Sequence, residues 1–437
     1  MKKVYLGSFN AEAYYAVEGY CRLPVFSLGG QKNNLFDAMD ELMLPMLEKD
    51  DVLITKYAVD KTFADYYGSE MQHFTAYSCM QAPNEGEPEG SIFHIIDQMR
   101  DENIVRELTE EKNQIVEYSL IPDCYELYRH LNIGGMNKPS MEIVKRVNNK
   151  AYSNQLRNML DLPCKGTVAG SAEEFADICS KMLEQYKAIL VKDIYGVSGQ
   201  GIIVVQNDYM IKRMTKHFAS QKYERFAFLL EPYLDKDRDF SCQFSIGEDG
   251  EIRIQGYQEN NNRKFTYLGS EFLSEEELMR LDPGYNDAIR RIGGRMYEDG
   301  YHGPVCVDSM ILKDQTVIPL VEINARLSMG RFNLMTCNTL KKYGTRSNLL
   351  FFKTSRKEKI GFEQLLDRLE QAGILYRKGA PCGVIPMAPN TWKFTPLGEP
   401  TRMYFQIVSE YGNDSVIELQ REKLIQSLEA LKIQIFE

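Results

Sequence analysis

The sequence lacks long hydrophobic runs. No stretch of its 437 residues approaches the ~20 consecutive apolar residues that a membrane-spanning helix needs. The start of the chain carries two lysines, but the apolar run that follows is too short for a secretory signal peptide. We therefore expect neither a transmembrane helix nor a membrane partner.

The sequence also lacks clustered cysteines and an excess of positive charge. Its nine cysteines are scattered between Cys21 and Cys382, and no two form a Cys-x-x-Cys pair. Disulfide frameworks and structural zinc sites need closely spaced cysteines, so we expect reduced thiols and a cytoplasmic protein. The formal net charge is −10. Because non-specific binding to nucleic acid needs a positive surface, this balance argues against a nucleic-acid partner.

Length and composition predict a globular protein of several structural units. At roughly 100–200 residues per domain, the length predicts two to four units, and 43% hydrophobic residues are enough to bury a core. Strand patterns at 4–9 and 51–55, separated by helical stretches, indicate an α/β domain over residues 1–142. We assign a second unit to residues 143–345 and a C-terminal α+β region to residues 346–437.

The second unit mixes helical and strand signals. Ser171 and Glu174 form a capping box, and the apolar residues that follow recur at helical spacing, which predicts a helix over 172–187. Residues 240–246 alternate between apolar and polar, which is typical of a strand with one buried face. The other predicted elements are strands at 188–193, 201–206, 226–231 and 251–257, a helix at 284–299, a hairpin at 305–324, and helices near 361–372 and 415–432.

Two acidic residues face each other in the predicted hairpin. If its turn is centred on Gln315, antiparallel pairing places Asp308 opposite Glu322, with Cβ atoms about 5 Å apart. Asn324 then projects from the same face. Facing carboxylates repel unless a cation neutralises them, and Mg²⁺ binds carboxylate and amide oxygens. The pattern indicates a magnesium site. The alternative is a polar face exposed to water, because a register slip of one residue would separate the carboxylates.

A lysine and a glycine-rich loop follow the strand at 188–193. Lys192 ends the strand, and Tyr195-Gly-Val-Ser-Gly-Gln-Gly201 leads into the next strand. Glycines let backbone amides approach phosphate oxygens, and a neighbouring lysine supplies positive charge. The stretch is not a phosphate loop of the Gly-x-x-x-x-Gly-Lys-Ser/Thr type, and it does not open a helix as a dinucleotide fingerprint does. A plain glycine-rich turn is the alternative.

Two cationic residues follow the predicted strand at 251–257. Arg263 and Lys264 lie in the stretch Asn260-Asn-Asn-Arg-Lys-Phe265. A cationic loop here can bind an acidic substrate. A solvated loop with asparagines as turn residues is an equal alternative.

Three segments together, in this order and spacing, resemble the ATP-grasp superfamily. They are Val191-Lys-Asp193 with Gly-Val-Ser-Gly-Gln-Gly-Ile-Ile-Val-Val205, then Glu231-Pro-Tyr-Leu234, then Asp308 with Glu322-Ile-Asn-Ala-Arg326. The resemblance covers residues 143–330. It implies an ATP-grasp fold, in which two α+β subdomains grip ATP, with an N-terminal α/β pre-ATP-grasp domain before it and an appended region after it.

The resemblance also implies which residues bind ATP and its metal. Those that would bind the nucleotide are Lys150, Lys192, the loop with Gly196, Ser198, Gly199 and Gly201, the adenine-reading Glu231, Pro232 and Leu234, and Asp239 at the ribose. Asp308, Glu322 and Asn324 would hold Mg²⁺, with Mn²⁺ as an alternative. Arg326 would steady an acyl phosphate, so it and Lys192 are the candidate catalytic residues. For Lys150, an exposed helical lysine is the alternative.

The implied activity is ATP-dependent ligation of a carboxylate to an amine, with release of ADP. The substrates would be an amino acid or small peptide and an amine, and a homodimer is compatible with the sequence. Alternatives are a ligase that loads an amino acid onto a carrier-protein thiol, a small-molecule kinase, and a nucleotide-binding regulator without turnover. The stretch Leu327-Ser-Met-Gly330 differs from the corresponding stretch of biotin carboxylases, and Cys306 stands where D-alanine ligases are expected to have an arginine. We therefore expect the substrates of neither enzyme family.

Overall fold

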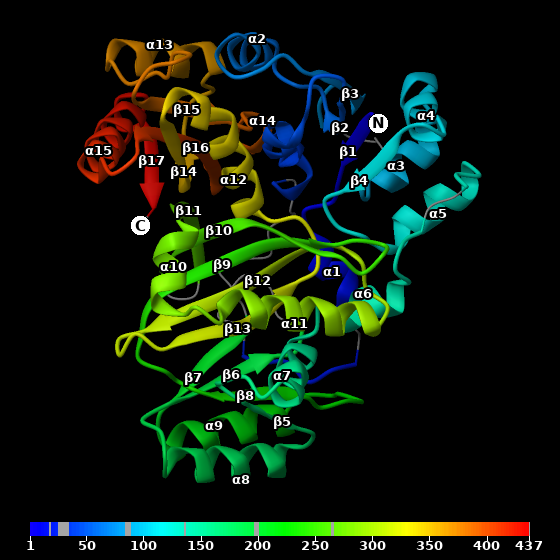
Figure 1. Cartoon of the computed structure of the whole chain (residues 1–437), viewed down its shortest axis with the longest axis vertical. Helices are drawn as coiled ribbons and strands as arrows, with labels where there is room; N and C mark the ends of the chain where they lie inside the picture. Colours follow the sequence, from blue (N-terminus) through cyan, green and yellow to red (C-terminus); the bar gives the residue numbers. More distant parts are fainter. Residues whose placement is uncertain are drawn as a thin grey trace.

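The computed structural model describes residues 1–16, 19–24, 35–83, 89–134, 137–195, 201–263 and 266–436. These residues form three β-sheets with helices packed on their faces (Figure 1). Within them, no helix combines the length and apolar character needed to cross a membrane.

The N-terminal unit is a parallel sheet with strand order β3-β2-β1-β4. Every residue of β2 is buried, as expected for a parallel strand with both faces covered. The strands are β1 (Lys3–Leu6), β2 (Val52–Tyr57), β3 (Thr75–Met80) and β4 (Gln114–Glu117). The helices are α1 (Ala11–Tyr15), α2 (Lys61–Glu70), α3 (Ile92–Met99), α4 (Glu102–Thr109) and α5 (Pro122–His130), with 3₁₀ helices η1 (Phe36–Ala38) and η2 (Asp40–Met46).

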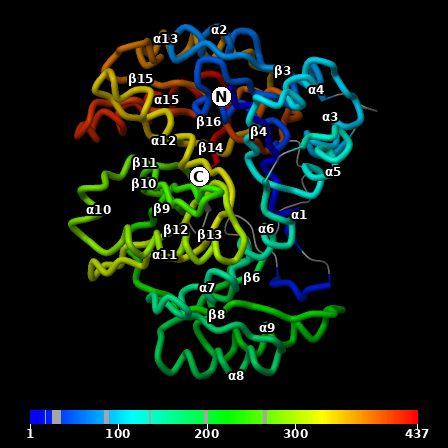
Figure 2. The backbone as a smooth tube through the Cα atoms, turned by 45° about the vertical axis from the view of Figure 1, so that its right-hand side comes forward, coloured from blue at the N-terminus to red at the C-terminus, as the bar shows by residue number. Residues whose placement is uncertain are grey.

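A small antiparallel sheet with strand order β5-β8-β6-β7 lies at the opposite end of the molecule (Figure 2). Apolar side chains from its strands and from α8 and α9 form a separate core, which includes Phe175, Phe218 and Phe228. The elements are β5 (Thr167–Ala169), β6 (Ile189–Asp193), β7 (Ile202–Val205), β8 (Phe228–Pro232), α8 (Ala172–Leu183) and α9 (Asp208–Ala219), preceded by α6 (Met141–Val147) and α7 (Lys150–Met159).

The largest sheet contains nine strands and extends from the middle of the molecule to the end where the N-terminal unit lies (Figure 1). Its order is β13-β12-β9-β10-β11-β14-β16-β15, with β17 paired to β14. The strands are β9 (Lys236–Ile246), β10 (Ile252–Arg263), β11 (Thr266–Leu273), β12 (Gly303–Leu312), β13 (Val317–Asn324), β14 (Thr345–Arg356), β15 (Gly383–Met387), β16 (Thr401–Glu410) and β17 (Ile433–Phe436). The helices are α10 (Glu275–Leu281), α11 (Tyr285–Glu298), α12 (Met329–Leu340), α13 (Phe362–Gln371), α14 (Asn390–Lys393) and α15 (Asp414–Ala430), with the 3₁₀ helix η3 (Lys341–Tyr343).

The nine-stranded sheet runs without a break from the predicted second unit into the C-terminal region. β11 pairs with β14 through Gly269 with Leu350 and Ser270 with Leu349. Gly269 allows the two backbones to approach, because a Cβ atom there would lie 2.2 Å from the Leu349 carbonyl oxygen. The predicted boundary between residues 345 and 346 therefore coincides with the first residues of β14.

Several predicted elements agree with the structure, but some bounds differ and one strand was not predicted. Ser171 caps α8 as predicted, with its Oγ accepting from the Glu174 N–H at 3.1 Å, although α8 ends at Leu183 rather than near residue 187. The strand predicted to end near residue 257 continues to Arg263 and pairs with β11, which was not predicted. Asn260–Asn262 therefore lie in a strand, so their interpretation as turn residues was wrong.

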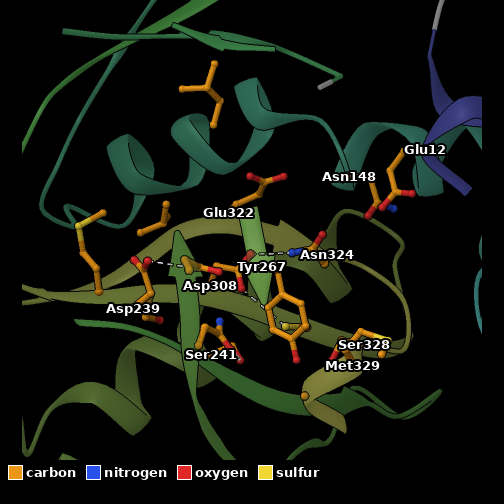
Figure 3. A pocket seen from close by; sticks show the side chains of 18 of the residues that line it. Glu12, Asn148, Asp239, Ser241, Tyr267, Asp308, Glu322, Asn324, Ser328 and Met329 are labelled. Carbon is orange, nitrogen blue, oxygen red and sulfur yellow. Dashed lines mark hydrogen bonds between the residues drawn. The ribbon is translucent and has the colours of Figure 1, made fainter. Parts of the chain in front are cut away.

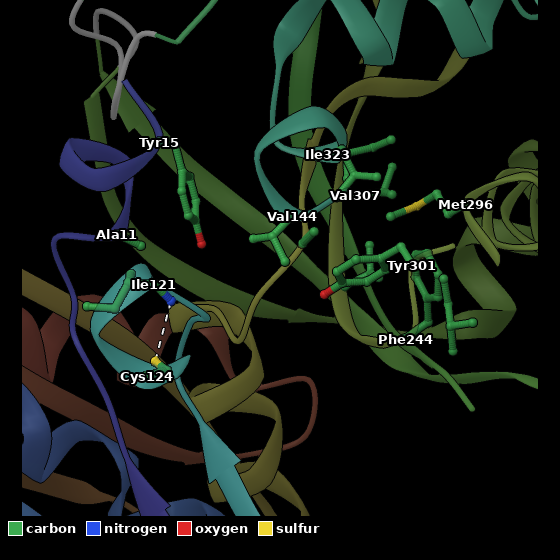
Figure 4. Close-up of a cluster of buried hydrophobic side chains, with 14 of the residues drawn as sticks. Ala11, Tyr15, Ile121, Cys124, Val144, Phe244, Met296, Tyr301, Val307 and Ile323 are labelled. Carbon is green, nitrogen blue, oxygen red and sulfur yellow. Dashed lines mark hydrogen bonds between the residues drawn. The ribbon is translucent and has the colours of Figure 1, made fainter. Parts of the chain in front are cut away.

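One hydrophobic core joins the N-terminal unit to the β12–β13 hairpin. It contains Ile121 and Cys124 at the start of α5, Val144 of α6, and Val307 and Ile323 of the hairpin (Figure 4). Full burial of such side chains stabilises a fold by about 1.5–3 kcal/mol each. The hairpin is thus held in place by residues that lie about 200 positions earlier in the chain.

Candidate functional site

The predicted pairing of Asp308 with Glu322 is present in the structure. Near the turn, however, Ile311 pairs with Val317, so the turn is centred on Asp314 and not on Gln315. A bulge in β13 around Pro319 supplies two extra residues and restores the predicted pairing. Since the shift is two residues, every side chain keeps its face.

The carboxylate of Asp308 belongs to a half-buried residue and lies in an acidic environment. Burial raises its pKa to about 7, and the charges of Glu322 and Asp239 add to the rise. Asn324 Nδ2 donates to Asp308 Oδ2 at 2.9 Å, and Figure 3 shows both residues lining the same pocket as Glu322. Two carboxylates and one amide therefore converge at the end of the hairpin.

Lys150, the first residue of α7, contacts Glu322. Its Nζ lies 2.6 Å from Glu322 Oε1, and the residue is only 5% exposed. The alternative interpretation of Lys150 as a solvated helical lysine was therefore wrong. The same segment also fixes the backbone of β13, because Ser153 Oγ accepts from the Ile323 N–H at 3.2 Å and Asn148 Oδ1 accepts from the Ala325 N–H at 2.8 Å.

A second buried charge cluster surrounds Glu231 at the end of β8. Lys192 Nζ lies 2.5 Å from Glu231 Oε2, and Arg157 of α7 donates to Glu231 Oε1. Burial favours the neutral acid, but the charges of Lys192 and Arg157 outweigh it and lower the pKa of Glu231. All three residues line one cavity. Arg157 was not singled out from the sequence, because an arginine in a polar helical stretch looks like a surface residue.

The segment after Glu231 presents backbone groups to the cavity. Pro232 and Leu234 line it, and the Tyr233 N–H is engaged by the Ala188 carbonyl at 3.0 Å. Across the cavity, Asp239 of β9 accepts from Asn262 Nδ2 at 2.8 Å and from Lys236. The unpredicted extension of β10 thus brings Asn262 beside Asp239.

Arg326 follows the hairpin and contacts the N-terminal unit. Its Nε donates to Glu12 Oε1 at 3.0 Å, and its Nη1 donates to the Tyr118 hydroxyl at 3.1 Å. Burial lowers the pKa of Arg326, but the Glu12 carboxylate and the Tyr118 and Tyr15 hydroxyls together outweigh it, so the pKa lies above its ordinary value. The guanidinium is therefore held as a cation in a fixed orientation. Neither Glu12 nor Tyr118 was singled out from the sequence.

The two carboxylates and the amide at the hairpin, Lys192, Arg157, Glu231, Asp239 and Arg326 border one cavity of about 460 Å³, whereas Lys150 and Ser153 do not. It extends from Leu190 and Glu231, past the hairpin, to Phe351 and Tyr404 of the C-terminal region. No group of three or more His, Cys, Asp or Glu side chains suited to a metal ion occurs among the described residues.

Comparison with known proteins supports this architecture. No protein-family model matches the chain. It is 23% identical over 253 residues to the [butirosin acyl-carrier protein]–L-glutamate ligase of Niallia circulans. That match covers 56% of this chain and 59% of the relative, so it spans less than two thirds of that protein.

Solved structures show a similar fold over nearly the whole chain. Biotin carboxylase of Campylobacter jejuni, in complex with β-γ-ATP, has a TM-score of 0.55 at 13% identity, over 88% of this chain and 87% of that one. The biotin carboxylase domain of 2-oxoglutarate carboxylase from Hydrogenobacter thermophilus, with MgADP and bicarbonate, has a TM-score of 0.53 at 15% identity, over 99% and 90%. The chain has the ATP-grasp fold.

Part of the predicted ATP-grasp site lies outside the described residues. Gly196, Ser198 and Gly199 of the glycine-rich loop belong to this part, as does Lys264. Gly201 is described: its φ is +80°, and its carbonyl accepts from the Asp193 N–H at 2.8 Å. Arg263 is the last residue of β10, and its proposed role toward a substrate stays a prediction.

Proposed function

We propose that this ATP-grasp chain is an ATP- and Mg²⁺-dependent ligase that activates a carboxylate as an acyl phosphate and joins it to an amine, releasing ADP and phosphate. The observation that carries the proposal is the pairing of Asp308 with Glu322 inside the cavity that also contains the Lys192–Glu231 ion pair. The nucleotide, a divalent cation and the acid would then bind at different parts of one cavity.

The nucleotide would bind between β6, β8 and the start of β9. Glu231, the Pro232 carbonyl and the Leu234 amide would read adenine, since the Tyr233 amide is already engaged. Asp239 would hold the ribose hydroxyls. The phosphates would meet Lys150, Lys192 and the loop with Gly196, Ser198, Gly199 and Gly201, because ammonium groups and backbone amides neutralise phosphate charge.

The residues at the end of the hairpin fit a hard divalent cation. Asp308, Glu322 and Asn324 supply oxygen ligands of the kind that Mg²⁺ or Mn²⁺ takes. Burial first, and then the charges of Glu322 and Asp239, raise the pKa of Asp308, and a cation beside it would offset both causes. When bound, the cation would neutralise charge on the phosphates and the acid. The identity of the three residues, with no thiolate or imidazole among them, favours Mg²⁺ over softer metals.

Arg326 would orient the substrate carboxylate and stabilise the acyl phosphate formed from it. A carboxylate is a poor electrophile because its leaving group would be an oxide. Transfer of the γ-phosphoryl group gives an acyl phosphate, from which an amine displaces phosphate. Phosphoryl transfer needs positioning and charge stabilisation more than covalent help from the protein. Arg326, fixed by Glu12 and Tyr118, can supply this without rearranging.

A second candidate acceptor is the thiol of a carrier protein. The relative from Niallia circulans is described as a ligase that acts on an acyl-carrier protein and L-glutamate. The same acyl phosphate would then be attacked by sulfur in place of nitrogen.

A homodimer is also a candidate assembly, since the Hydrogenobacter thermophilus neighbour was solved as a dimer. Light scattering in solution tests it.

The decisive experiment measures products. The purified chain, ATP and Mg²⁺ are supplied with pairs of amino acids and amines, and with a carrier protein in its thiol form, and ADP, phosphate and new conjugates are quantified by mass spectrometry. We expect ADP and phosphate in equal amounts with an amide or thioester. A stable phosphorylated small molecule would favour the kinase alternative, and AMP with pyrophosphate would contradict the proposal.

A further inference from the structure

Two cations of the C-terminal region lie opposite each other on the wall of the cavity. Lys353 of β14 pairs directly with Arg402 of β16, and both side chains line the cavity. Directly paired residues of an antiparallel ladder project from the same face, with Cβ atoms about 4.5–5.5 Å apart. Two like charges are therefore placed side by side, an arrangement that destabilises a sheet unless an anion lies between them.

No described acidic residue forms an ion pair with Lys353 or Arg402. The other four lysines and arginines that line the cavity all have a carboxylate partner. They are Arg157, Lys192, Lys236 and Arg326. Among the residues that the structure describes, Lys353 and Arg402 thus differ from the remaining cavity cations in having no carboxylate partner.

Aromatic rings contact the arginine of this pair. The guanidinium of Arg402 lies 5.0 Å from the ring centroid of Phe351 and 5.9 Å from that of Phe36. Phe351 in turn pairs across the ladder with Tyr404, with ring centroids 5.3 Å apart. Contacts with ring faces hold a guanidinium in place without supplying a negative charge. This wall therefore combines an apolar surface with the held guanidinium of Arg402 and the exposed side chain of Lys353.

We propose that Lys353 and Arg402 bind a carboxylate of a substrate that is not the carboxylate being activated. The inference rests on the proposed ligase function and deepens it. An amino acid or dicarboxylic acid carries such a second group, and an enzyme that activates only one must hold the other away from the γ-phosphate. An arginine with a neighbouring lysine suits a carboxylate, and the rings would contact the aliphatic part between the two ends.

Binding is the direct test. The probes are L-glutamate, L-glutamine and L-isoglutamine, which share a skeleton and differ in which carboxylate is replaced by an amide. Their dissociation constants are measured by calorimetry on the full chain with Mg²⁺ and a non-hydrolysable ATP analogue. The variants are Arg402→Gln and Lys353→Gln, with Arg402→Lys as the conservative change. Lys357→Gln is the control, because Lys357 is exposed and does not line the cavity.

We expect wild-type protein to bind L-glutamate and one of the two amides. Arg402→Gln should weaken binding by at least about tenfold, the loss typical of one charge-assisted contact. Arg402→Lys should restore part of it, and Lys357→Gln should have no effect. The affinity for the ATP analogue should stay unchanged in all variants, which shows that the fold and nucleotide site are intact.

Two results would overturn the inference. One is equal affinity for the carboxylates in wild type and Arg402→Gln. The other is binding of inorganic phosphate, but of none of the three carboxylates, in an Arg402-dependent way, which would assign the pair to a phosphate group. Failure of the ligase proposal looks different: Arg402-dependent carboxylate binding would persist, while no ADP forms with any acid and amine.

Discussion

Glu12 and Arg326 are joined by hydrogen bonds although 314 positions separate them in the chain. Glu12 lies in α1, within the N-terminal unit, and Arg326 follows the hairpin that carries Asp308 and Glu322. The N-terminal unit therefore contributes to the orientation of the arginine proposed to stabilise the acyl phosphate.

Glu12→Gln should lower kcat by about tenfold or more, because loss of one charge-assisted hydrogen bond leaves Arg326 less well oriented. The KM for ATP should change little, since the hydrogen bonds of the Glu12 side chain come from Arg326 and not from the residues proposed to bind the nucleotide. Steady-state kinetics at saturating ATP measures this. Glu102→Gln, on the exposed start of α4, is the matched control. An unchanged kcat in Glu12→Gln would show that turnover does not depend on the orientation of Arg326 by Glu12.

Asp308→Asn and Glu322→Gln should each reduce turnover by at least about 100-fold while leaving the far-ultraviolet circular dichroism spectrum unchanged. Both substitutions keep side-chain size and remove a charged oxygen ligand. Asp314→Asn, in the turn of the same hairpin, should retain full activity, because Asp314 is exposed and only accepts from the Thr316 N–H. Folded Asp308 and Glu322 variants with most of their activity would contradict the metal assignment.

Lys192→Ala should weaken binding of a fluorescent ATP analogue by about 10- to 100-fold, the range expected for removal of one charge from a phosphate site. Turnover should fall as well. Arg157 still neutralises Glu231 in this variant, so the protein should stay folded. Lys181→Ala, on the exposed face of α8, provides the control. Equal affinity in both variants would place the phosphates elsewhere.

A pH dependence of stability should arise from the buried carboxyls of Asp40 and Glu41. Burial raises their pKa values from 3.8 and 4.5 to about 8 in each case. In the folded state they stay protonated at pH values where the unfolded chain has already released these protons, so the free energy of unfolding falls as the pH rises from about 4 to 8. The protein should therefore be less stable at pH 8 than at pH 5.

Urea unfolding at pH 5 and pH 8 measures this effect. The double variant Asp40→Asn, Glu41→Gln should show a smaller difference between the two pH values than wild type, because amides do not titrate. Backbone amides of Lys56 and Asn390 donate to the two carboxyls, and the new side chains keep an acceptor oxygen for each. The same pH slope in the double variant would assign the titration to other groups.

The sequence predicted the groups that lie within one local segment. Asp308, Glu322 and Asn324 were found because alternation along a hairpin determines which side chains share a face. The turn is centred on a different residue than predicted. The pairing of Asp308 with Glu322 is nevertheless present, because the irregularity in β13 shifts the register by two residues. Lys192 and Glu231 were likewise found from motifs of a few residues.

Residues that reach the site from distant segments were missed. Glu12 and Tyr118 meet Arg326 only after the N-terminal unit packs on the hairpin, and no local pattern marks them. Lys353 and Arg402 face each other because two strands about 50 residues apart pair in one register. β11 was missed because its residues have no strict alternation and follow directly on β10.

The join between β11 and β14 limits how this protein can be divided. A chain cut after residue 345 would lose β14, and with it the partner of Gly269 and Ser270. β11 would then end the sheet with unpaired backbone donors and acceptors, a template on which other chains can aggregate. Exchange of the C-terminal region between related enzymes would therefore have to preserve the residues that pair β11 with β14. The region cannot be removed as an independent domain.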